Sequence, residues 1–588
     1  MANIKIEDPE LEMLVNLKTS HFNYRKRRQD DWTENYTLYR DKVTINRLTQ
    51  RQSVNLPLMK MTIRTLLKDV DDMPVLYFEN LDNDKQAETF QNEYWKKVGE
   101  VNKMDLKDII DKRQVFHYGR SFDQMQITNG MPIFTIQDPT DMLIDRFVDP
   151  ADIDTARSLI HTHIFVPLSS LENNPAYDKK AVAELINWHG TEMGLIKEAE
   201  NQEMLSKKNE KMADMGLEDI ESPILGEAYV ELSLNFVFRE KENWHGTEFE
   251  DQIFMYVTAD DQKILQKAPL EEVIGKTKDH YWQTHYPYNT WADDVDRQDF
   301  WSDGIADIVR TPNKVLNSWF SQLVENRTLR NFGMHYYDST AGEDFNPQTF
   351  NAIPWGWYGV PGKPQDLLQK VDIPDLSEAL DEMTFVATMI EKATGATSTQ
   401  QGSEVQRQIT LGEVQLALGE AKERIKGMSK FYTPAWKSRG EKFLKLIEAA
   451  PDKLDAVKIY KKGRNTDEVF SREIEPTNWM TKSGYKARIW SQDEKNTQDG
   501  NALQKLNATV VNMPNNPKLL DIYQRKLLEF ADLTPEENNE VMDFEREKRA
   551  ALINQPLAGA GADEGVGNTG QVSPIPLSAG QPQPQPTA

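Results

Sequence analysis

The chain has 588 residues, too many for one hydrophobic core, and its net charge is -25 at pH 7. It contains no cysteine, which excludes disulfide bonds, thiolate zinc sites and cysteine nucleophiles. The acidic balance disfavours a protein whose main task is to grip nucleic acid, because phosphate contacts need an excess of Lys and Arg. It leaves open a protein past which nucleic acid slides.

The sequence also shows no signal for membrane insertion or secretion. No apolar run approaches the roughly 18 residues that a membrane helix requires. Residues 1–10 show no basic stretch followed by an apolar one, as a signal peptide would. We therefore expect no membrane insertion and a cytoplasm-like compartment.

Residues 10–112 have a mostly helical pattern, with an extended segment at 73–78. The dense basic cluster at 24–28 precedes Trp32, Tyr36 and Tyr39, which follow at helical spacing. Two interpretations are open for this cluster. It is a contact for nucleic acid or an acidic partner, or it is a solvated helix face that pairs with the many carboxylates of the chain.

Beyond residue 111 the hydrophobic period becomes that of strands. The Asn129-Gly130 pair between alternating segments predicts a β-hairpin. Further strands are expected over 158–166 and 228–264, with a charged helical region at 181–219 between them. These alternations predict an α+β body.

His161 and His163 are expected on one face of the 158–166 strand. Two such imidazoles could ligate a metal ion, but no third ligand is in view, so ordinary sheet positions are the alternative. A six-residue repeat, Asn-Trp-His-Gly-Thr-Glu, occurs at 187–192 and 243–248 with unmatched flanks. It indicates coincidence or two similar turns and not a duplicated domain.

Motifs for catalysis are near misses. The Gly275-Lys276-Thr277 run lacks the earlier glycine that a phosphate-binding loop needs, because position 270 is Leu. No zincin, nucleophile-elbow or EF-hand pattern occurs, and no spacing singles out a carboxylate cluster. The sequence predicts no catalytic residue, no metal ligand and no cofactor.

Residues 301–447 predict a hairpin of helices. Ser302 is the expected N-cap of the first helix, and Pro312 within it predicts a kink or a fresh start capped by Thr311. The second helix ends near Thr394, and Leu380, Phe385 and Met389 are counted in its apolar stripe. An insert rich in aromatic residues, Pro and Gly joins the two helices, and a polar loop and a long helix follow them.

The order of these parts resembles the portal (head-to-tail connector) proteins of tailed bacteriophages. The resemblance covers roughly residues 23–549 and lies in the order and spacing of motifs that are individually degenerate. The residues that carry it are the run 300–307 with Asn317 and Ser321, the pairs Asp138-Pro139 and Asp149-Pro150, and the run 392–396 before 397–408.

The resemblance implies an α+β, mainly helical, portal-type subunit that assembles into a ring with an axial channel. The implied parts are a wing at 1–301, stem helices at 302–330 and 373–394, a clip at 331–372, a channel (tunnel) loop at 395–408, a long wing helix with closing strands at 409–492, crown helices at 493–549 and a disordered tail at 550–588.

The implied function is structural and not enzymatic. Portal proteins form rings of about twelve subunits at one capsid vertex of the virion, after assembly in the host cytoplasm. Double-stranded DNA passes through the channel during packaging and ejection. The implied partners are further copies of the chain, the terminase large subunit, the major capsid protein, the scaffold, and a tail or adaptor protein. The alternatives are another capsid or tail-adaptor ring protein and a metal-dependent nuclease.

Two sets of site residues follow from the resemblance. The expected DNA-channel contacts are Thr397, Ser398, Thr399, Gln400, Gln401, Ser403, Arg407, Lys314, Arg327 and Arg330. The expected docking residues of the clip are Tyr336, Tyr337, Phe350, Trp355, Trp357 and Tyr358. So many aromatic residues in a short insert suit burial against a ring neighbour or a docking partner, and a small hairpin packed on itself is the alternative.

Overall fold

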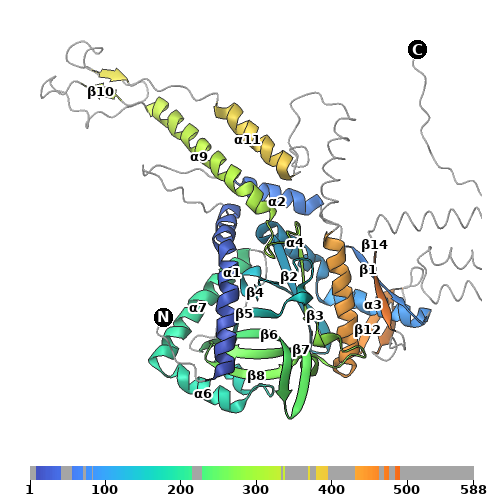
Figure 1. Cartoon of the computed structure of the whole chain (residues 1–588). Coiled ribbons are helices and arrows are strands. Elements are labelled where there is room, and N and C mark those ends of the chain that lie inside the picture. Colours follow the sequence, from blue (N-terminus) through green and yellow to red (C-terminus); the bar gives the residue numbers. More distant parts are fainter. Residues whose placement is uncertain are drawn as a thin grey trace, which may run out of the picture. The chain divides into compact units, whose positions relative to one another are not determined.

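The computed structural model describes residues 8–40, 56–69, 74–82, 84–214, 228–332, 335–337, 368–370, 379–394, 431–462, 469–475 and 484–490 (Figure 1). The chain divides into two units, Met1–Asn496 and Thr497–Ala588, and all of these residues belong to the first unit. The expected crown helices at 493–549 and the tail at 550–588 lie outside the described residues.

The described chain mixes helices with antiparallel sheets, which confirms the α+β class. Its α-helices are α1 (Pro9–Tyr39), α2 (Leu58–Asp69), α3 (Lys85–Val101), α4 (Met104–Tyr118), α5 (Leu168–Glu172), α6 (Lys179–His189), α7 (Glu192–Asp214), α8 (Leu270–Ile274), α9 (Ile305–Phe332) and α11 (Ala379–Thr394). Residues 431–449 are also helical. Short 3-10 helices are η1 (Pro139–Asp141), η2 (Ile153–Thr155), η3 (Tyr281–Gln283) and η5 (Pro451–Lys453).

The strands confirm the change of period beyond residue 111. They are β1 (Val75–Asn80), β2 (Arg120–Thr128), β3 (Met131–Gln137), β4 (Met142–Ile144), β5 (Ser158–Pro167), β6 (Tyr229–Trp244), β7 (Thr247–Ala259), β8 (Lys263–Pro269), β9 (Tyr288–Ala292), β10 (His335–Tyr337), β11 (Leu368–Lys370), β12 (Val457–Lys462), β13 (Val469–Ile474) and β14 (Tyr485–Trp490). The strand expected at 73–78 is β1, and its partner is β14.

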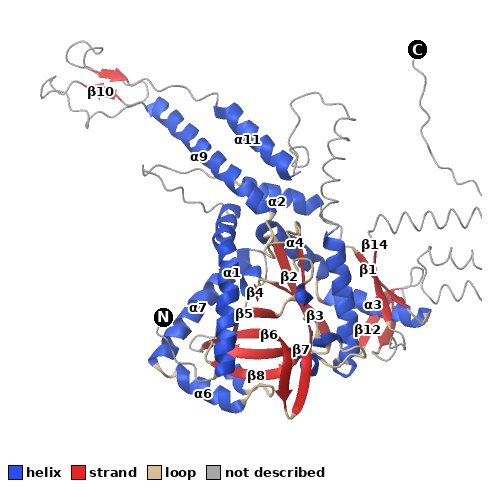
Figure 2. Ribbon diagram, in the orientation of Figure 1, coloured by secondary structure: helices blue, strands red, loops and turns tan. Residues whose placement is uncertain are grey.

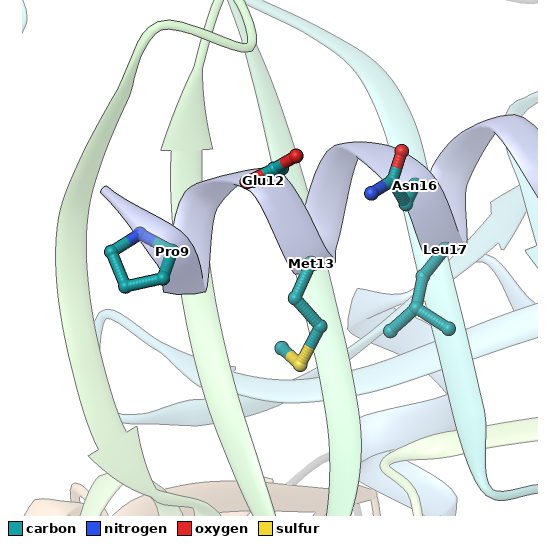
Figure 3. A pocket seen from close by; sticks show the side chains of 5 residues that line it. All are labelled: Pro9, Glu12, Met13, Asn16 and Leu17. Atoms are coloured by element: carbon teal, nitrogen blue, oxygen red, sulfur yellow. The ribbon is translucent and has the colours of Figure 1, made fainter. Parts of the chain in front are cut away.

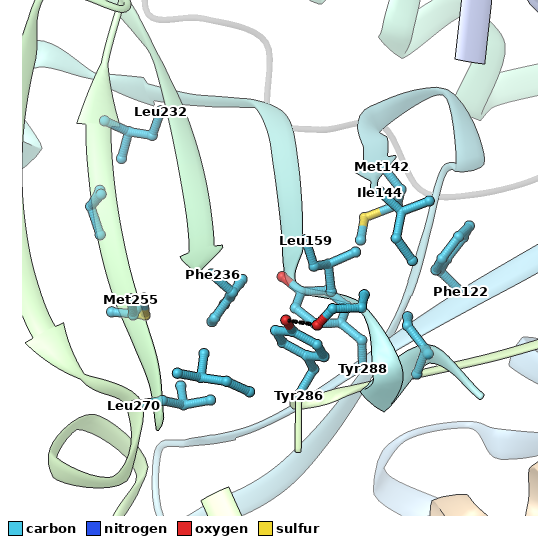
Figure 4. Packing of buried hydrophobic residues seen from close by; sticks show 14 of the residues in the cluster. Phe122, Met142, Ile144, Leu159, Leu232, Phe236, Met255, Leu270, Tyr286 and Tyr288 are labelled. Carbon is cyan, nitrogen blue, oxygen red and sulfur yellow. Dashed lines mark hydrogen bonds between the residues drawn. The ribbon is translucent and has the colours of Figure 1, made fainter. Parts of the chain in front are cut away.

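The main sheet has the order β4-β5-β6-β7-β8, with every pair antiparallel (Figure 2). A large core cluster lies on it, in which the side chains of Leu159, Phe236 and Tyr288 are at most 1% exposed (Figure 4). Tyr286 joins this core and donates its hydroxyl hydrogen bond to the carbonyl of Ala156 at 2.7 Å, the dashed line of Figure 4. Buried aromatic residues of this size supply much of the stability of such a core.

A second sheet of order β3-β2-β9 contains the hairpin that the sequence predicts. Asn129 and Gly130 both have positive φ, 49° and 74°, as a two-residue type I′ turn requires. The hairpin prediction is therefore confirmed.

The expectation that His161 and His163 share one strand face is wrong. A β-bulge lies between His161 and Ile164, and His163 has φ 58°, so the alternation of side chains is broken between the two imidazoles. His161 Nδ1 lies 3.1 Å from the Tyr288 hydroxyl, whereas His163 Nδ1 lies 2.9 Å from Asp141 Oδ1. The two residues thus have different partners.

The two copies of the six-residue repeat adopt different turns. The first copy spans the end of α6 and the start of α7, where Gly190 has φ -75°. The second copy is the tip of the β6–β7 hairpin, where His245 and Gly246 have positive φ. The repeat is therefore not a shared turn geometry.

Helix α1 runs across the main sheet, and an ion-pair network holds it there (Figure 1). Lys18 Nζ lies 2.8 Å from Asp261 and 3.5 Å from Glu231 on β6, and Lys197 Nζ of α7 lies 3.3 Å from the same Glu231. Burial alone would raise the pKa of Glu231, but Lys18, His163 and Lys197 lower it to about 2. The charged form of Glu231 thus links α1 and α7 to the main sheet.

We expect Glu231→Gln to lower the free energy of unfolding by about 3 kcal/mol at pH 7. The ordinary pKa of this carboxyl, 4.5, applies in the unfolded chain. Between pH 4.5 and about 2, Glu231 is therefore mostly protonated in the unfolded chain and mostly ionised in the folded one. The contribution of Glu231 is therefore complete above pH 4.5 and is lost as the pH falls toward 2. Urea unfolding followed by tryptophan fluorescence at pH 7 and pH 3 checks this.

The matched control is Glu250→Gln, at an exposed position of the neighbouring strand β7. Its effect should stay within about 0.5 kcal/mol at both pH values. A destabilisation by Glu231→Gln that is the same at pH 3 and pH 7 would contradict the assignment.

Candidate functional site: the α9–α11 hairpin

Helix α9 begins at Ile305, so Ser302 is not its N-cap as expected from the sequence. Asp307 reaches back from the first turn, and its Oδ2 accepts a hydrogen bond from the backbone N–H of Gly304 at 2.9 Å. Gly304 thus holds the capping position, in the manner of the reciprocal half of a capping box. Ser302 is buried, and its hydroxyl has no hydrogen-bond partner among the described residues.

Two glycines explain why the helix begins where it does. A Cβ on Gly304 would lie 2.7 Å from the carbonyl oxygen of Phe116, and one on Gly119 would lie 1.8 Å from that of Ser302. Gly119 also has φ 76° as the C-cap of α4. The end of α4 and the start of α9 therefore meet backbone to backbone, which only glycine allows.

The fresh start expected at Pro312 does not occur, because α9 is helical without interruption from Ile305 to Phe332. Thr311 therefore caps nothing. Pro312 removes one backbone donor from the interior of the helix. Packing on either side of Pro312 stabilises the helix, because Val309 and Leu316 are both buried in one apolar cluster.

The N-terminal half of α9 is fixed to α1 by charges. Asp307 Oδ1 accepts from Asn35 Nδ2 at 2.9 Å, and Arg310 Nη1 lies 2.8 Å from Asp31. Lys314 Nζ lies 2.5 Å from Glu34, and both side chains are about half exposed. This last pair contributes little stability, as is usual for exposed ion pairs.

The C-terminal part of α9 carries the other two cations expected in the channel. Arg327 and Arg330 are both exposed. Of the α9 residues after Ser321 whose side chains the structure describes, none is buried.

Helix α11 lies beside α9, and the two helices pack directly against each other (Figure 2). Met383, Val386 and Ile390 pack toward α9 and α2. Leu380, Phe385 and Met389, the other apolar residues that the sequence places on this helix, do not pack in this cluster. These three side chains are 52%, 66% and 49% exposed.

Between Met383 and Ile390, α11 carries no charged side chain. Thr384 and Thr388 lie between the exposed apolar side chains, and each donates its hydroxyl hydrogen bond to the carbonyl four residues earlier, at 2.8 Å. Their hydroxyls are thus satisfied within the helix. We call Leu380, Thr384, Phe385, Thr388 and Met389 the α11 stripe.

Strands β10 and β11 bring the two ends of the aromatic insert together. Tyr336 pairs with Gln369 and Tyr337 pairs with Leu368 in antiparallel register. The other docking residues expected from the sequence, Phe350, Trp355, Trp357 and Tyr358, lie outside the described residues. So do all the expected channel-loop residues, Thr397, Ser398, Thr399, Gln400, Gln401, Ser403 and Arg407.

The helical segment 431–449 is anchored in the body by a buried arginine, Arg439. Arg439 Nη2 lies 2.7 Å from Asp123 Oδ2 and 3.1 Å from Asp111 Oδ2. Burial disfavours the charge of Arg439, but Asp123 and Asp111 raise the pKa of the guanidinium above its ordinary value. The sequence alone does not single out this group, because its two carboxylates look like any others in so acidic a chain.

The basic cluster at 24–28 pairs with the protein itself. Arg27 and Arg28 form ion pairs with Asp299 and Asp303 respectively, just before α9. Arg25 is buried, unlike a residue of a solvated face, and donates to the carbonyl of Met142 at 3.2 Å. The geometry supports pairing with the chain's own carboxylates.

Within the described ranges, no group of three or more His, Cys, Asp and Glu side chains could hold a metal ion. The nearest approach to a nucleophile and base is Ser158 Oγ with His21 Nε2, at 2.6 Å. Both residues are about 5% exposed or less. A substrate could not reach this pair without opening the core.

No protein-family model matches this sequence, and no curated protein matches it in sequence comparison. Among the described helices, none is both long and apolar enough to span a membrane.

We expect Gly119→Ala to destabilise the protein by about 3 kcal/mol or more, because it adds a backbone clash to the strain of positive φ. Gly246→Ala is the matched control. Gly246 has φ 79°, yet its added Cβ would meet nothing within 4 Å, so it should cost about 1 kcal/mol. Urea unfolding of both variants measures the difference. Equal effects would contradict the close contact between α4 and α9.

Proposed function

We propose that the chain is the portal protein of a tailed bacteriophage, a ring at one capsid vertex through which double-stranded DNA is packaged and ejected. The observation that carries the proposal is the α9–α11 pair with the exposed apolar side chains of the α11 stripe. Phe385 and Met389 are four residues apart, so they are neighbours on the helix surface. Exposed apolar groups with satisfied polar neighbours suit burial against another protein.

The position of the stripe in the chain adds support. The paired helices enclose an insert whose ends meet in β10 and β11, and the body from which α9 starts is a separate α+β core. This is the order of stem, clip and wing that portal subunits have. The stripe then faces a neighbouring stem, and the clip docks the terminase large subunit and later a tail or adaptor protein.

The proposed ring gives the acidic charge a role. Each subunit of the proposed ring has a net charge of -25. Where carboxylates line the wall, DNA is repelled from it and stays centred, and exposed cations such as Arg327 and Arg330 give local phosphate contacts. This combination favours sliding over tight binding.

The purified full-length chain should form a ring of about 0.8 MDa by light scattering, about twelve times the chain mass of 67.7 kDa, with a central hole by negative-stain microscopy. Phe385→Asp with Met389→Asp should return it to smaller species, because each carboxylate would be buried unpaired. The matched control is Leu195→Asp on α7, where Leu195 is 58% exposed. A wild-type chain that stays monomeric at micromolar concentration would overturn the proposal.

A further inference from the structure

A small, largely enclosed cavity lies between α4 and the 431–449 helix. Its volume is about 10 Å³, at the lower limit for one water molecule. Its polar wall consists of Lys107, Asp108, Asp111, Asp123 and Arg439. The hollow at the start of α1 differs, because one face of that helix alone lines it and its Met13 and Leu17 point toward the neighbouring strands (Figure 3). Charges in the enclosed cavity are therefore largely cut off from bulk water.

Asp108 is the carboxylate of this cavity that is short of partners. Its side chain is 3% exposed, and its Oδ2 lies 2.6 Å from Lys112 Nζ. Its Oδ1 is buried and has no hydrogen-bond partner among the described residues. Asp111 and Asp123, in contrast, each accept hydrogen bonds at both oxygens, from Arg439 and other buried donors. Protonation of Asp108 removes a buried charge and turns Oδ1 into a donor for a water molecule in the cavity.

The charges around the cavity also favour one added proton. Within the described part of the chain, the three carboxylates share two cations in direct contact, Lys112 and Arg439. Lys107 lines the cavity as well, but its Nζ donates to the carbonyl of Phe134 and to the side chain of Asn102. The site thus holds one more carboxylate than cations paired with it.

The pKa values agree with this geometry. Burial raises the pKa of Asp108 to about 6, because it outweighs the attraction of Lys112 and Arg439, and the charge of Asp111 also raises it. Burial raises the pKa of Asp111 as well, but the donors to both of its oxygens favour its ionised form. Asp108 is therefore the group of this cluster that takes up a proton near pH 6.

Asp108 is connected to the 431–449 helix through Lys112. Lys112 Nζ lies 5.0 Å from the centroid of the Tyr432 ring, and Trp436, one turn later in the same helix, lines the cavity. Tyr432 and Trp436 are at most 2% exposed. A cation over an aromatic ring contributes more when both groups are removed from water. The charge of Asp108 therefore acts on the contact between α4 and this helix.

We infer that Asp108 binds a proton in this cavity and that the bound proton strengthens the docking of the 431–449 helix on α4. When the helix is docked, the carboxyl is buried and keeps its proton up to about pH 6; when it is undocked, the carboxyl is hydrated and has its ordinary pKa of 3.8. The contribution of the proton is therefore complete below pH 3.8 and is lost as the pH rises through about 6. The inference does not depend on the proposed ring.

Hydrogen exchange of the full-length protein, measured by mass spectrometry in peptides from 431–449, reports how often this helix undocks. After correction for the intrinsic exchange rate, the equilibrium constant for opening should rise about tenfold between pH 5 and pH 8. Asp108→Asn should remove this rise, because the amide keeps the shape of the side chain and has no proton to lose. The matched control is Asp105→Asn, at an exposed position one turn earlier on α4, which should keep the rise.

Lys112→Met provides a second readout, which a purely structural role of Asp108 would not change. Lys112 lowers the pKa of Asp108, so its removal should move the midpoint of the pH dependence upward by about one pH unit or more. An Asp108→Asn protein with the same rise as the wild type overturns the inference, and so does a Lys112→Met midpoint that stays near that of the wild type. If Asp108→Asn does not fold, the Lys112→Met midpoint decides alone.

Discussion

The fold depends on the contacts of one helix, α1, with parts of the chain that are distant in sequence. At 31 residues it is about 45 Å long, enough to pass from the main sheet to the base of α9. Its first half packs Leu14 on β6 and β7, and its last turns place Leu38 and Tyr39 in the cluster that holds α9. A change that bent or shortened α1 would therefore move the hairpin relative to the sheet.

Charge pairing along α1 explains how an acidic chain keeps this arrangement. Lys18, Arg27 and Arg28 each take carboxylates from other elements, and Arg25 donates to backbone carbonyls in the core. Arg25, Arg27 and Arg28 of the basic cluster at 24–28 thus have partners within the chain itself.

The contact that we propose for the α11 stripe relies on apolar side chains on a rigid support, because α11 packs against α9. Groups held in this way bind without first being ordered, so that little of the contact energy is lost.

The sequence alone determined the elements whose signal is local. The period of apolar residues located the helices and strands, and Asn129-Gly130 specified a hairpin because only certain residues adopt positive φ readily. The prediction that Ser302 is the N-cap of α9 was wrong. The helix begins at Ile305, where Gly119 and Gly304 let the backbones of α4 and α9 approach closely. The exposure of Phe385 and Met389 could not be read from the sequence, because periodicity shows which residues share a face and not which face is covered. Only the tertiary structure decided these points, along with the pairing of Arg439 with Asp111 and Asp123, since they depend on contacts between residues far apart in the chain.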